Sequence, residues 1–190
     1  MIDLFQSITD LQGRLLREGI PSITIGGVAV AVWGEPRVTR DVDLKVLIGR
    51  GDADRLLRVL TPDYTPLVQN PVELLKKQAI LFVRDPSGTR MDLLLAETPY
   101  DIKAIQRVRE VEIQPGYIIR VCSPEDLVIY KLISTRSRDH EDAMSVIRRQ
   151  SSLLDEEYII EWLRQFEIAL DDSTLVSEFY SFISKSKGDS

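Results

Sequence analysis

The sequence contains a single cysteine, Cys122, and a single histidine, His140, among 190 residues. One cysteine forms no internal disulfide and supplies one thiolate at most, which excludes a cysteine-based zinc site. One histidine argues against zinc held by several imidazoles and disfavours a Ser-His-Asp triad. Any catalysis by this chain must therefore depend on carboxylates, glycines and basic residues.

Long apolar runs and an excess of positive charge are also missing. No stretch approaches the roughly 18 apolar residues of a membrane span, and the first residues, MIDLFQSITD, are acidic and polar, unlike a signal peptide. We therefore expect a cytoplasmic protein with no membrane partner. The net charge of −6 disfavours a protein devoted to non-specific nucleic-acid binding.

Hydrophobic periodicity predicts alternating helices and strands, followed by a helical part. The predicted strands cover residues 22–25, 41–48, 79–85, 89–97, 109–114 and 117–122. Helices are predicted over 2–18, 28–34, 51–61, 71–78 and 98–108. Asp52 is the expected N-cap of one helix, and Ser123 followed by Pro124 predicts the start of another. We expect an α+β fold with a mixed β-sheet, in which residues 1–122 form the core and a helical region, 123–190, packs on it.

Two carboxylates, Asp41 and Asp43, begin an otherwise apolar strand. Side chains alternate along a strand, so both point to one face while Val42 and Leu44 point to the other. Two carboxylates a few Å apart repel each other unless a cation lies between them. Mg²⁺ suits this position because it takes one or two protein carboxylates and completes its shell with water and phosphate oxygens. The bland alternative is a solvated strand end with two exposed acids.

Two further features favour phosphoryl transfer. Gly26-Gly27 precedes a short apolar helix, so backbone N–H groups at the helix start are accessible to a phosphate. Asp92 begins a later apolar strand and adds a third carboxylate if that strand lies beside the Asp41 strand. The glycines would then hold a triphosphate that Mg²⁺ bridges to the Asp pair, while the third carboxylate activates an incoming hydroxyl.

These residues resemble the signature of the nucleotidyltransferase (polymerase beta-like) superfamily. Ile25-Gly26-Gly27 is followed, after thirteen residues, by Asp41-Val42-Asp43-Leu44. The pattern Arg37-x-Thr39-x-Asp41 and the later stretch PEDLVIYKLIS-x-R-x-RD are similar to one branch of that superfamily. This branch contains the minimal nucleotidyltransferases and the toxins of AbiE-type abortive-infection systems. The resemblance covers about residues 23–143.

The resemblance implies a mixed sheet with packed helices that binds an NTP and two Mg²⁺ ions. It implies that Asp41 and Asp43 are metal ligands. Asp92 would complete the second metal site and serve as the general base or assist it. Gly26 and Gly27 would hold the phosphates.

The resemblance also implies roles for residues outside the carboxylate cluster. Lys131 would neutralise phosphate charge, with Asp139 positioning it or closing the site. Thr39 belongs to the matching pattern and is expected near the nucleotide. Arg37 and Arg40, in the same loop, either contact the triphosphate or the acceptor, or neutralise the Asp pair; both interpretations stay open.

The sequence therefore predicts a Mg²⁺-dependent nucleotidyltransferase that moves an NMP group from an NTP to a hydroxyl. The acceptor is RNA (tRNA in particular), a protein or a small molecule, and the resemblance adds a toxin with a cognate antitoxin partner. A group of arginines in the C-terminal helices would suit RNA: Arg136, Arg138, Arg148 and Arg149. The alternatives are a non-catalytic partner protein that keeps the fold, and an NTP- or RNA-binding module.

Overall fold

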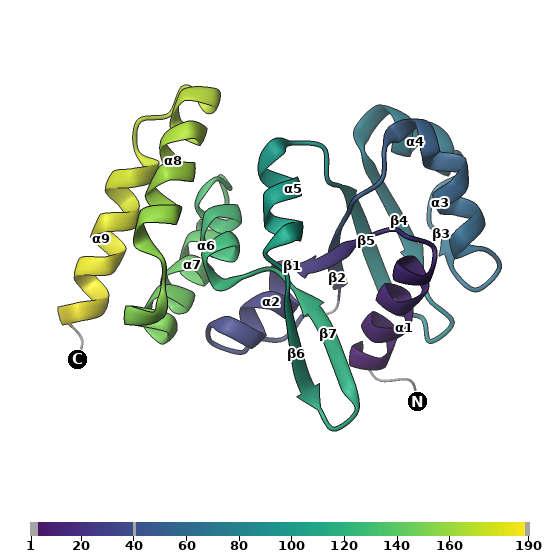
Figure 1. Cartoon of the computed structure of the whole chain (residues 1–190), viewed down its shortest axis with the longest axis horizontal. Coiled ribbons are helices and arrows are strands. Elements are labelled where there is room, and N and C mark those ends of the chain that lie inside the picture. Colours follow the sequence, from purple (N-terminus) through teal and green to yellow (C-terminus); the bar gives the residue numbers. More distant parts are fainter. Residues whose placement is uncertain (1–3, 40, 189–190) are drawn as a thin grey trace. The chain divides into compact units, whose positions relative to one another are not determined.

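The structure is a computed structural model that describes residues 4–39 and 41–188, and the chain forms two compact units (Figure 1). The first unit contains the residues up to Val28 and Val38–Cys122. The second contains Ala29–Arg37 and the chain from Ser123 onward. The chain passes into the helical unit at Ser123, and this unit also contains the short segment Ala29–Arg37.

A mixed β-sheet forms the centre of the first unit. Within the described residues it has seven strands in the order β3-β4-β5-β2-β1-β7-β6. The strands are β1 (Ser22–Ile25), β2 (Asp41–Val46), β3 (Thr65–Pro66), β4 (Ile80–Arg84), β5 (Arg90–Leu95), β6 (Arg109–Gln114) and β7 (Tyr117–Val121). The pairs β2–β5 and β1–β7 are parallel, and the other neighbours are antiparallel. The predicted mixed sheet is confirmed.

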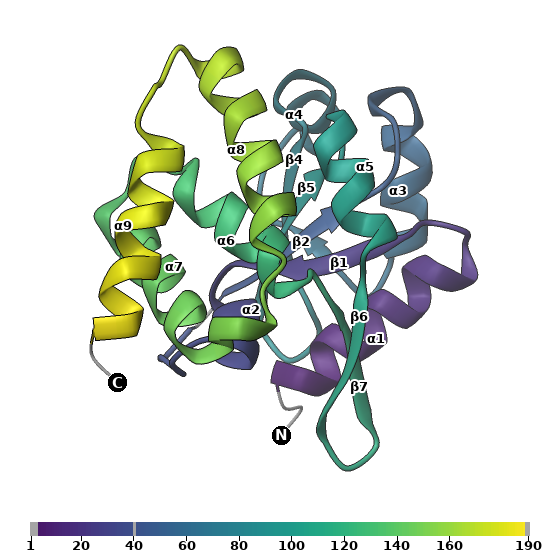
Figure 2. The ribbon, with the colours of Figure 1, turned by 60° about the vertical axis from the view of Figure 1, so that its left-hand side comes forward.

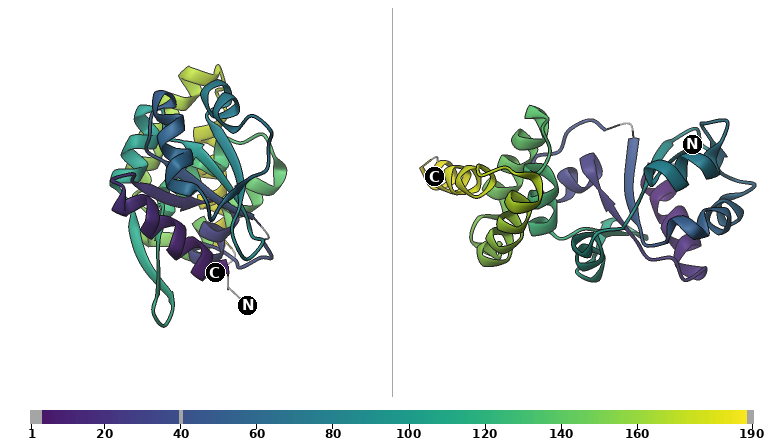
Figure 3. Two further views of the ribbon diagram at one scale, coloured as in Figure 1. Left: turned by 90° about the vertical axis from the view of Figure 1, so that its right-hand side faces the viewer. Right: turned by 90° about the horizontal axis from the view of Figure 1, so that it is seen from above.

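Helices complete the core of this unit. They are α1 (Leu4–Arg17), α3 (Ala53–Leu60), α4 (Pro71–Gln78) and α5 (Pro99–Gln106). Helix α1 contacts β1 and β7, while α4 contacts β4 and α3. Every second residue of β2 and β5 is buried, as expected for strands with one face toward a core. The β6–β7 hairpin forms one edge of the sheet and extends beyond the other strands (Figure 3).

Two helix starts differ from the prediction. Helix α3 begins at Ala53, after a short 3₁₀ turn, η1 (Arg50–Asp52). Asp52 occupies the N-cap position of α3, as predicted, but its side chain makes no capping hydrogen bond there. Helix α2 (Gly26–Trp33) begins two residues earlier than predicted, because the glycines form its first turn.

The second unit is helical, as predicted. It contains α6 (Pro124–Leu132), α7 (Ser137–Gln150), η2 (Ser151–Leu153), α8 (Glu156–Leu170) and α9 (Leu175–Gly188). Helix α6 contacts α7 and α8, and α9 contacts the same two helices (Figure 2). Ser123 caps α6 as expected, since its hydroxyl accepts a hydrogen bond from the Asp126 N–H at 3.2 Å. Across residues 4–39 and 41–188, no helix has both the length and the apolar character needed to cross a bilayer.

Candidate active site

The three predicted carboxylates come together on one face of the sheet. Asp43 on β2 is the register partner of Asp92 on β5, and Asp41 is the register partner of Arg90. Strands β2 and β5 are parallel neighbours, so these pairs lie at the ordinary spacing of adjacent strands. The residues between them along each strand are buried, which leaves the carboxylates on the opposite, more exposed face. The predicted convergence of the two strands is confirmed.

Gly26 lies directly against the Asp43 carboxylate. Strand β1 ends at Ile25, the register partner of Asp43, and Gly26 follows with a φ of +64°. A Cβ atom at Gly26 would lie 2.0 Å from Oδ2 of Asp43. The left-handed backbone and the close approach both require glycine at this position. The first turn of α2 therefore begins beside a carboxylate of the cluster.

The remaining residues of the glycine and loop motifs lie in different environments. Gly27 is buried in the first turn of α2. Thr39 is half-buried, and its hydroxyl donates to the backbone carbonyl of Asp41 at 3.1 Å. Arg40, predicted to bind the nucleotide or the Asp pair, lies outside the described residues. Among these glycine and loop residues, Gly26 is the one whose contact with the Asp43 carboxylate is established.

Arg90 is a member of the cluster that the sequence analysis missed. Its Nε and Nη2 donate to the two carboxylate oxygens of Asp92 at 2.8 and 3.0 Å. The hydrogen bond to Asp92 raises the pKa of Arg90, and the charges of Asp41 and Asp43 raise that pKa further. One cation thus lies within electrostatic reach of three carboxylates. The signal was present in the sequence, because Arg90 precedes Asp92 by two residues and so shares its face of the strand.

The donor set suits a magnesium ion that is bound together with nucleotide phosphates. Among the described residues, no three or more His, Cys, Asp and Glu side chains form a ready-made metal cage. Mg²⁺ does not need one, since it is held by one or two carboxylates plus water and phosphate oxygens. Asp43 and Asp92 supply such oxygens from neighbouring strands, and Gly26 keeps side-chain atoms out of the adjoining space. The residues therefore fit the Mg²⁺ ion that the sequence resemblance implies.

Lys131 and Asp139 form a buried ion pair within the helical unit. Nζ of Lys131 lies 2.5 Å from Oδ1 of Asp139 and 2.9 Å from Oδ2 of Asp142. Relative exposures are 4% for Lys131, 3% for Asp139 and 5% for Asp142. The structure therefore brings the two predicted residues together and adds Asp142, which the sequence analysis missed. The spacing of three residues between the two acids, which puts them on one face of α7, was the available signal.

Arg37 also pairs with Asp142. Its Nε and Nη2 donate to the two oxygens of Asp142 at 2.8 and 2.9 Å. Burial raises the pKa of Asp142, but the hydrogen bonds from Arg37 and Lys131 lower it by a larger amount, so the net shift is downward. Neither interpretation offered for Arg37 included an acid of the helical unit. The bidentate pair fixes the segment before β2 to α7.

Helix α7 also holds the end of α2. Arg149 donates to the carbonyl of Gly34 at 2.6 Å, and Gln150 donates to the carbonyl of Trp33 at 2.7 Å. These bonds satisfy carbonyl groups that a helix end leaves without intrahelical partners. Arg136 pairs with Asp139 at 2.5 Å. Arg148 lies 3.9 Å from a carboxylate oxygen of Glu35, so three of the four arginines that would suit RNA make contacts within their own unit.

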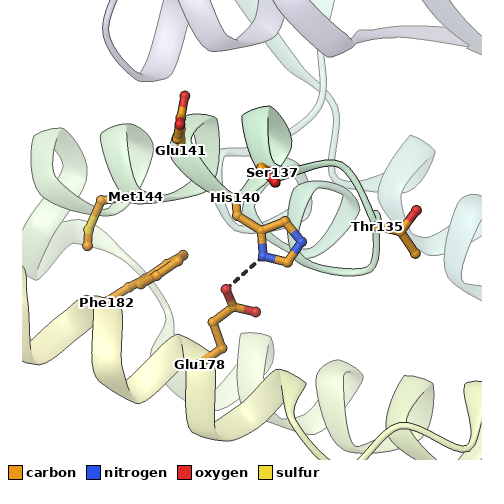
Figure 4. Close-up of a pocket in the computed structure, with 7 residues that line it drawn as sticks. All are labelled: Thr135, Ser137, His140, Glu141, Met144, Glu178 and Phe182. Carbon is orange, nitrogen blue, oxygen red and sulfur yellow. Dashed lines mark hydrogen bonds and ion pairs between the residues drawn. The ribbon is translucent and has the colours of Figure 1, made fainter.

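A cavity of about 550 Å³ lies between α7 and α9 in the helical unit (Figure 4). It is lined by Thr135, Ser137, His140, Glu141, Met144, Glu178 and Phe182. Nδ1 of His140 lies 2.7 Å from Oε1 of Glu178, and Nε2 lies 2.6 Å from the carbonyl oxygen of Ser134. With Glu178 ionised, both ring nitrogens face acceptors, an arrangement that the doubly protonated imidazolium satisfies. This histidine joins two helices of the unit.

The chain is similar in structure, but not in sequence, to several known proteins. No family model and no curated protein matches the sequence. The chain aligns with an antigenic nucleotidyltransferase-like protein from Paracoccidioides brasiliensis at 19% identity and a TM-score of 0.53, covering 92% of each chain. It aligns with the antibiotic-resistance factor ANT(2″)-Ia at 15% identity and a TM-score of 0.55, covering 88% of this chain and 94% of that one. The fold is that of the nucleotidyltransferases.

A second structure of the same resistance factor agrees with this assignment. ANT(2″)-Ia in complex with adenylyl-2″-tobramycin aligns at 15% identity and a TM-score of 0.52, covering 93% of this chain and 97% of that one. These likenesses confirm the predicted nucleotidyltransferase fold. The AbiE-type toxin branch and the roles of individual residues stay predictions.

Proposed function

We propose that this chain is a Mg²⁺-dependent nucleotidyltransferase that transfers an NMP group from an NTP to a hydroxyl. One observation carries the proposal: Asp41, Asp43 and Asp92 share one face of two parallel strands, with the backbone of Gly26 against Asp43. Carboxylates beside a glycine at a helix start are the combination that a metal-bound triphosphate requires. The fold shared with ANT(2″)-Ia supports the same reaction class.

The three carboxylates would hold two Mg²⁺ ions. When bound, these ions neutralise the triphosphate and polarise the phosphorus that is attacked. Gly26 and Gly27 would donate backbone N–H groups to phosphate oxygens at the start of α2. The chain's own residues would thus supply the carboxylate ligands of the ions and hold the nucleotide in a fixed position.

The transfer step forms one bond to the α-phosphorus and breaks another. The acceptor hydroxyl gives its proton to the Asp92 carboxylate, and its oxygen forms a bond to the α-phosphorus. The bond from the α-phosphorus to the oxygen bridging to the β-phosphorus breaks, and pyrophosphate leaves with that electron pair. The step requires no thiol, imidazole or organic cofactor, in agreement with a sequence that has one cysteine and one histidine.

Lys131 retains its predicted role toward phosphate as a separate part of the proposal. Asp139 would then orient the ammonium group, which it contacts at 2.5 Å. The two buried acids already balance the charge of Lys131, so its variants must be assayed for folding as well as for transfer. A Lys131→Arg variant that folds and loses transfer would support the phosphate role.

For the acceptor, a small-molecule hydroxyl is the first candidate, because ANT(2″)-Ia carries an adenylylated aminoglycoside on the same fold. RNA and protein hydroxyls are the other candidates, and a toxin acting on RNA would have an antitoxin partner. Arg136 and Arg149 make contacts within their own unit but stay exposed, so a basic surface remains for an RNA acceptor. The acceptor is therefore tested directly.

The experiment uses each NTP labelled at the α-phosphorus, Mg²⁺, and three separate acceptor pools: aminoglycosides, total RNA and total protein. We expect label on one pool and loss of about 100-fold or more in Asp41→Ala and Asp43→Ala. Asp54→Asn, which changes an exposed acid on α3, is the control. Transfer at the parent rate by Asp41→Ala would show that the site is wrong. Nucleotide-dependent stabilisation without transfer to any pool would favour the binding module.

A further inference from the structure

The side chain of Arg90 lies on the same sheet face as the carboxylates and contacts both Asp92 and Phe82. Its guanidinium donates to both oxygens of Asp92, at 2.8 and 3.0 Å. On the other side, its central carbon lies 4.9 Å from the centre of the Phe82 ring. Phe82 on β4 is the register partner of Asp92, so three adjacent strands contribute to this arrangement with Asp41. The guanidinium is therefore held by a cation–π contact as well as by the ion pair.

The bidentate pair defines the orientation of Asp92. A guanidinium offers two parallel N–H donors in a rigid plane, and a carboxylate that accepts both must lie close to that plane. A lysine would supply the same charge but a single point of contact. The pair thus restricts rotation of the carboxylate about its last side-chain bond. Carboxylates that bind metals are commonly hydrogen-bonded in this way by a second group.

The charge of Arg90 offsets part of the cluster. Three carboxylates on one sheet face repel one another, and each gains from a nearby cation. Arg90 is the register partner of Asp41 and bonds directly to Asp92, which is itself the register partner of Asp43, so the guanidinium lies among the three acids. Arg90 therefore lowers the cost of holding the acids together, which keeps them in place for a metal ion.

We propose that Arg90 is a positioning residue for the metal-binding carboxylates: it fixes the orientation of Asp92 and counterbalances the three acids. The inference rests on the proposed function and concerns the affinity of the site for a divalent cation. Loss of a group that orients a metal ligand typically weakens metal binding by about 10–100-fold. Arg90 acts through Asp92, and in this proposal it touches neither the nucleotide nor the acceptor.

The test measures metal binding without nucleotide. The unfolding temperature of the parent, Arg90→Gln and Arg90→Lys is followed while Mg²⁺ or Mn²⁺ is titrated, and the metal concentration at half of the full shift is compared. We expect this concentration to rise by about 10–100-fold in Arg90→Gln. Arg90→Lys is expected to lie between the two, because it keeps the charge and loses the second hydrogen bond.

Arg84→Gln is the matched control. Arg84 is the register partner of Arg90 on β4 and bears the same charge, but it donates to the carbonyl of Gly88 at 2.8 Å. Its removal changes the net charge near the site by the same amount but breaks no bond to a carboxylate of the cluster, so the half-saturation concentration should not rise. A rise of equal size in both variants would show that the effect does not come from the bond to Asp92, and would overturn the orienting role.

The remaining outcomes separate this inference from the proposed function. A parent that binds metal and transfers nucleotide, with Arg90→Gln binding metal equally well, overturns the role of Arg90 alone. Tighter binding by Arg90→Gln would also overturn it, since Arg90 would then compete with the metal. A parent that shows neither a metal-dependent shift nor transfer contradicts both proposals. If Arg90→Gln does not fold, the comparison of Arg90→Lys with the parent decides.

Discussion

A Cβ atom at Gly26 would lie 2.0 Å from Oδ2 of Asp43 and 2.8 Å from its Cγ. The start of α2 and a carboxylate of β2 are therefore in direct van der Waals contact, and no residue with a side chain fits between them. This contact joins the two halves of the sequence motif, glycines and acids, at one point. It also explains why the helix begins at the glycines and not after them.

Gly26→Ala should destabilise the first unit and displace the Asp43 carboxylate. The left-handed backbone alone costs about 1–2 kcal/mol for an alanine, and the collision with Asp43 adds to that cost. Gly19→Ala is the control, because Gly19 has a φ of +68° and nothing within 4 Å of a built Cβ. Chemical denaturation of both variants, with Mg²⁺ titration, separates strain from the loss of the site. Equal losses of stability and equal metal responses would contradict the contact argument.

Asp43→Asn should reduce the stabilisation produced by Mg²⁺. Asp43 and Asp92 are register partners on neighbouring parallel strands, so the substitution removes one charged oxygen ligand from the proposed metal site. The measurement is the shift in unfolding temperature between a chelator and Mg²⁺, in the parent and in the variant. A shift of the same size in both would exclude Asp43 as a metal ligand.

Lys131→Met should strongly destabilise the helical unit. Its ammonium group bridges the acids Asp139 and Asp142, which are 3% and 5% exposed, and removing it leaves both with less compensation. Breaking one partner out of a buried pair typically costs about 3–5 kcal/mol. Lys103→Met, at an exposed position on α5, should change the free energy of unfolding little. A small effect of Lys131→Met in urea denaturation would show that the charges are better hydrated than their burial indicates.

The His140–Glu178 pair should stabilise the contact between α7 and α9 at low and neutral pH. Burial lowers the pKa of His140, but its bonds to Glu178 and to the Ser134 carbonyl raise it more, so the net direction is upward. A pKa raised in the folded state means that the folded protein holds the proton more tightly. The stabilisation is thus complete below the unfolded pKa of about 6.5 and is lost as the pH rises through the folded pKa.

Hydrogen exchange of α9 measures this dependence. The amides of α9 should exchange faster at pH 8.5 than at pH 6, after correction for intrinsic rates. Glu178→Gln removes the anionic partner of the imidazolium, so its protection should depend less on pH. An identical pH dependence in the parent and in Glu178→Gln would exclude the pair as its cause.

Much of the fold was predictable from local patterns. Alternation of apolar residues placed Asp41 and Asp43 on one face, and the burial pattern of β2 agrees. The serine before Pro124 predicted the start of α6, and its hydroxyl caps the helix. Asp52 is the N-cap residue of α3, as predicted, but a residue type favoured at helix starts does not show that a 3₁₀ turn comes first or that the side chain forms the capping bond.

By itself, the sequence determined which side chains share a face, where most helices and strands lie, and which chemistries the scarcity of histidine and cysteine excludes. These follow from the periodicity of strands and helices, which acts over a few residues. Only the tertiary structure decided that Asp43 lies opposite Asp92 and that Arg37 binds Asp142, 105 positions away. Strand order and helix packing depend on burying whole apolar faces against each other, so residues distant in the chain become partners for reasons that no short motif contains.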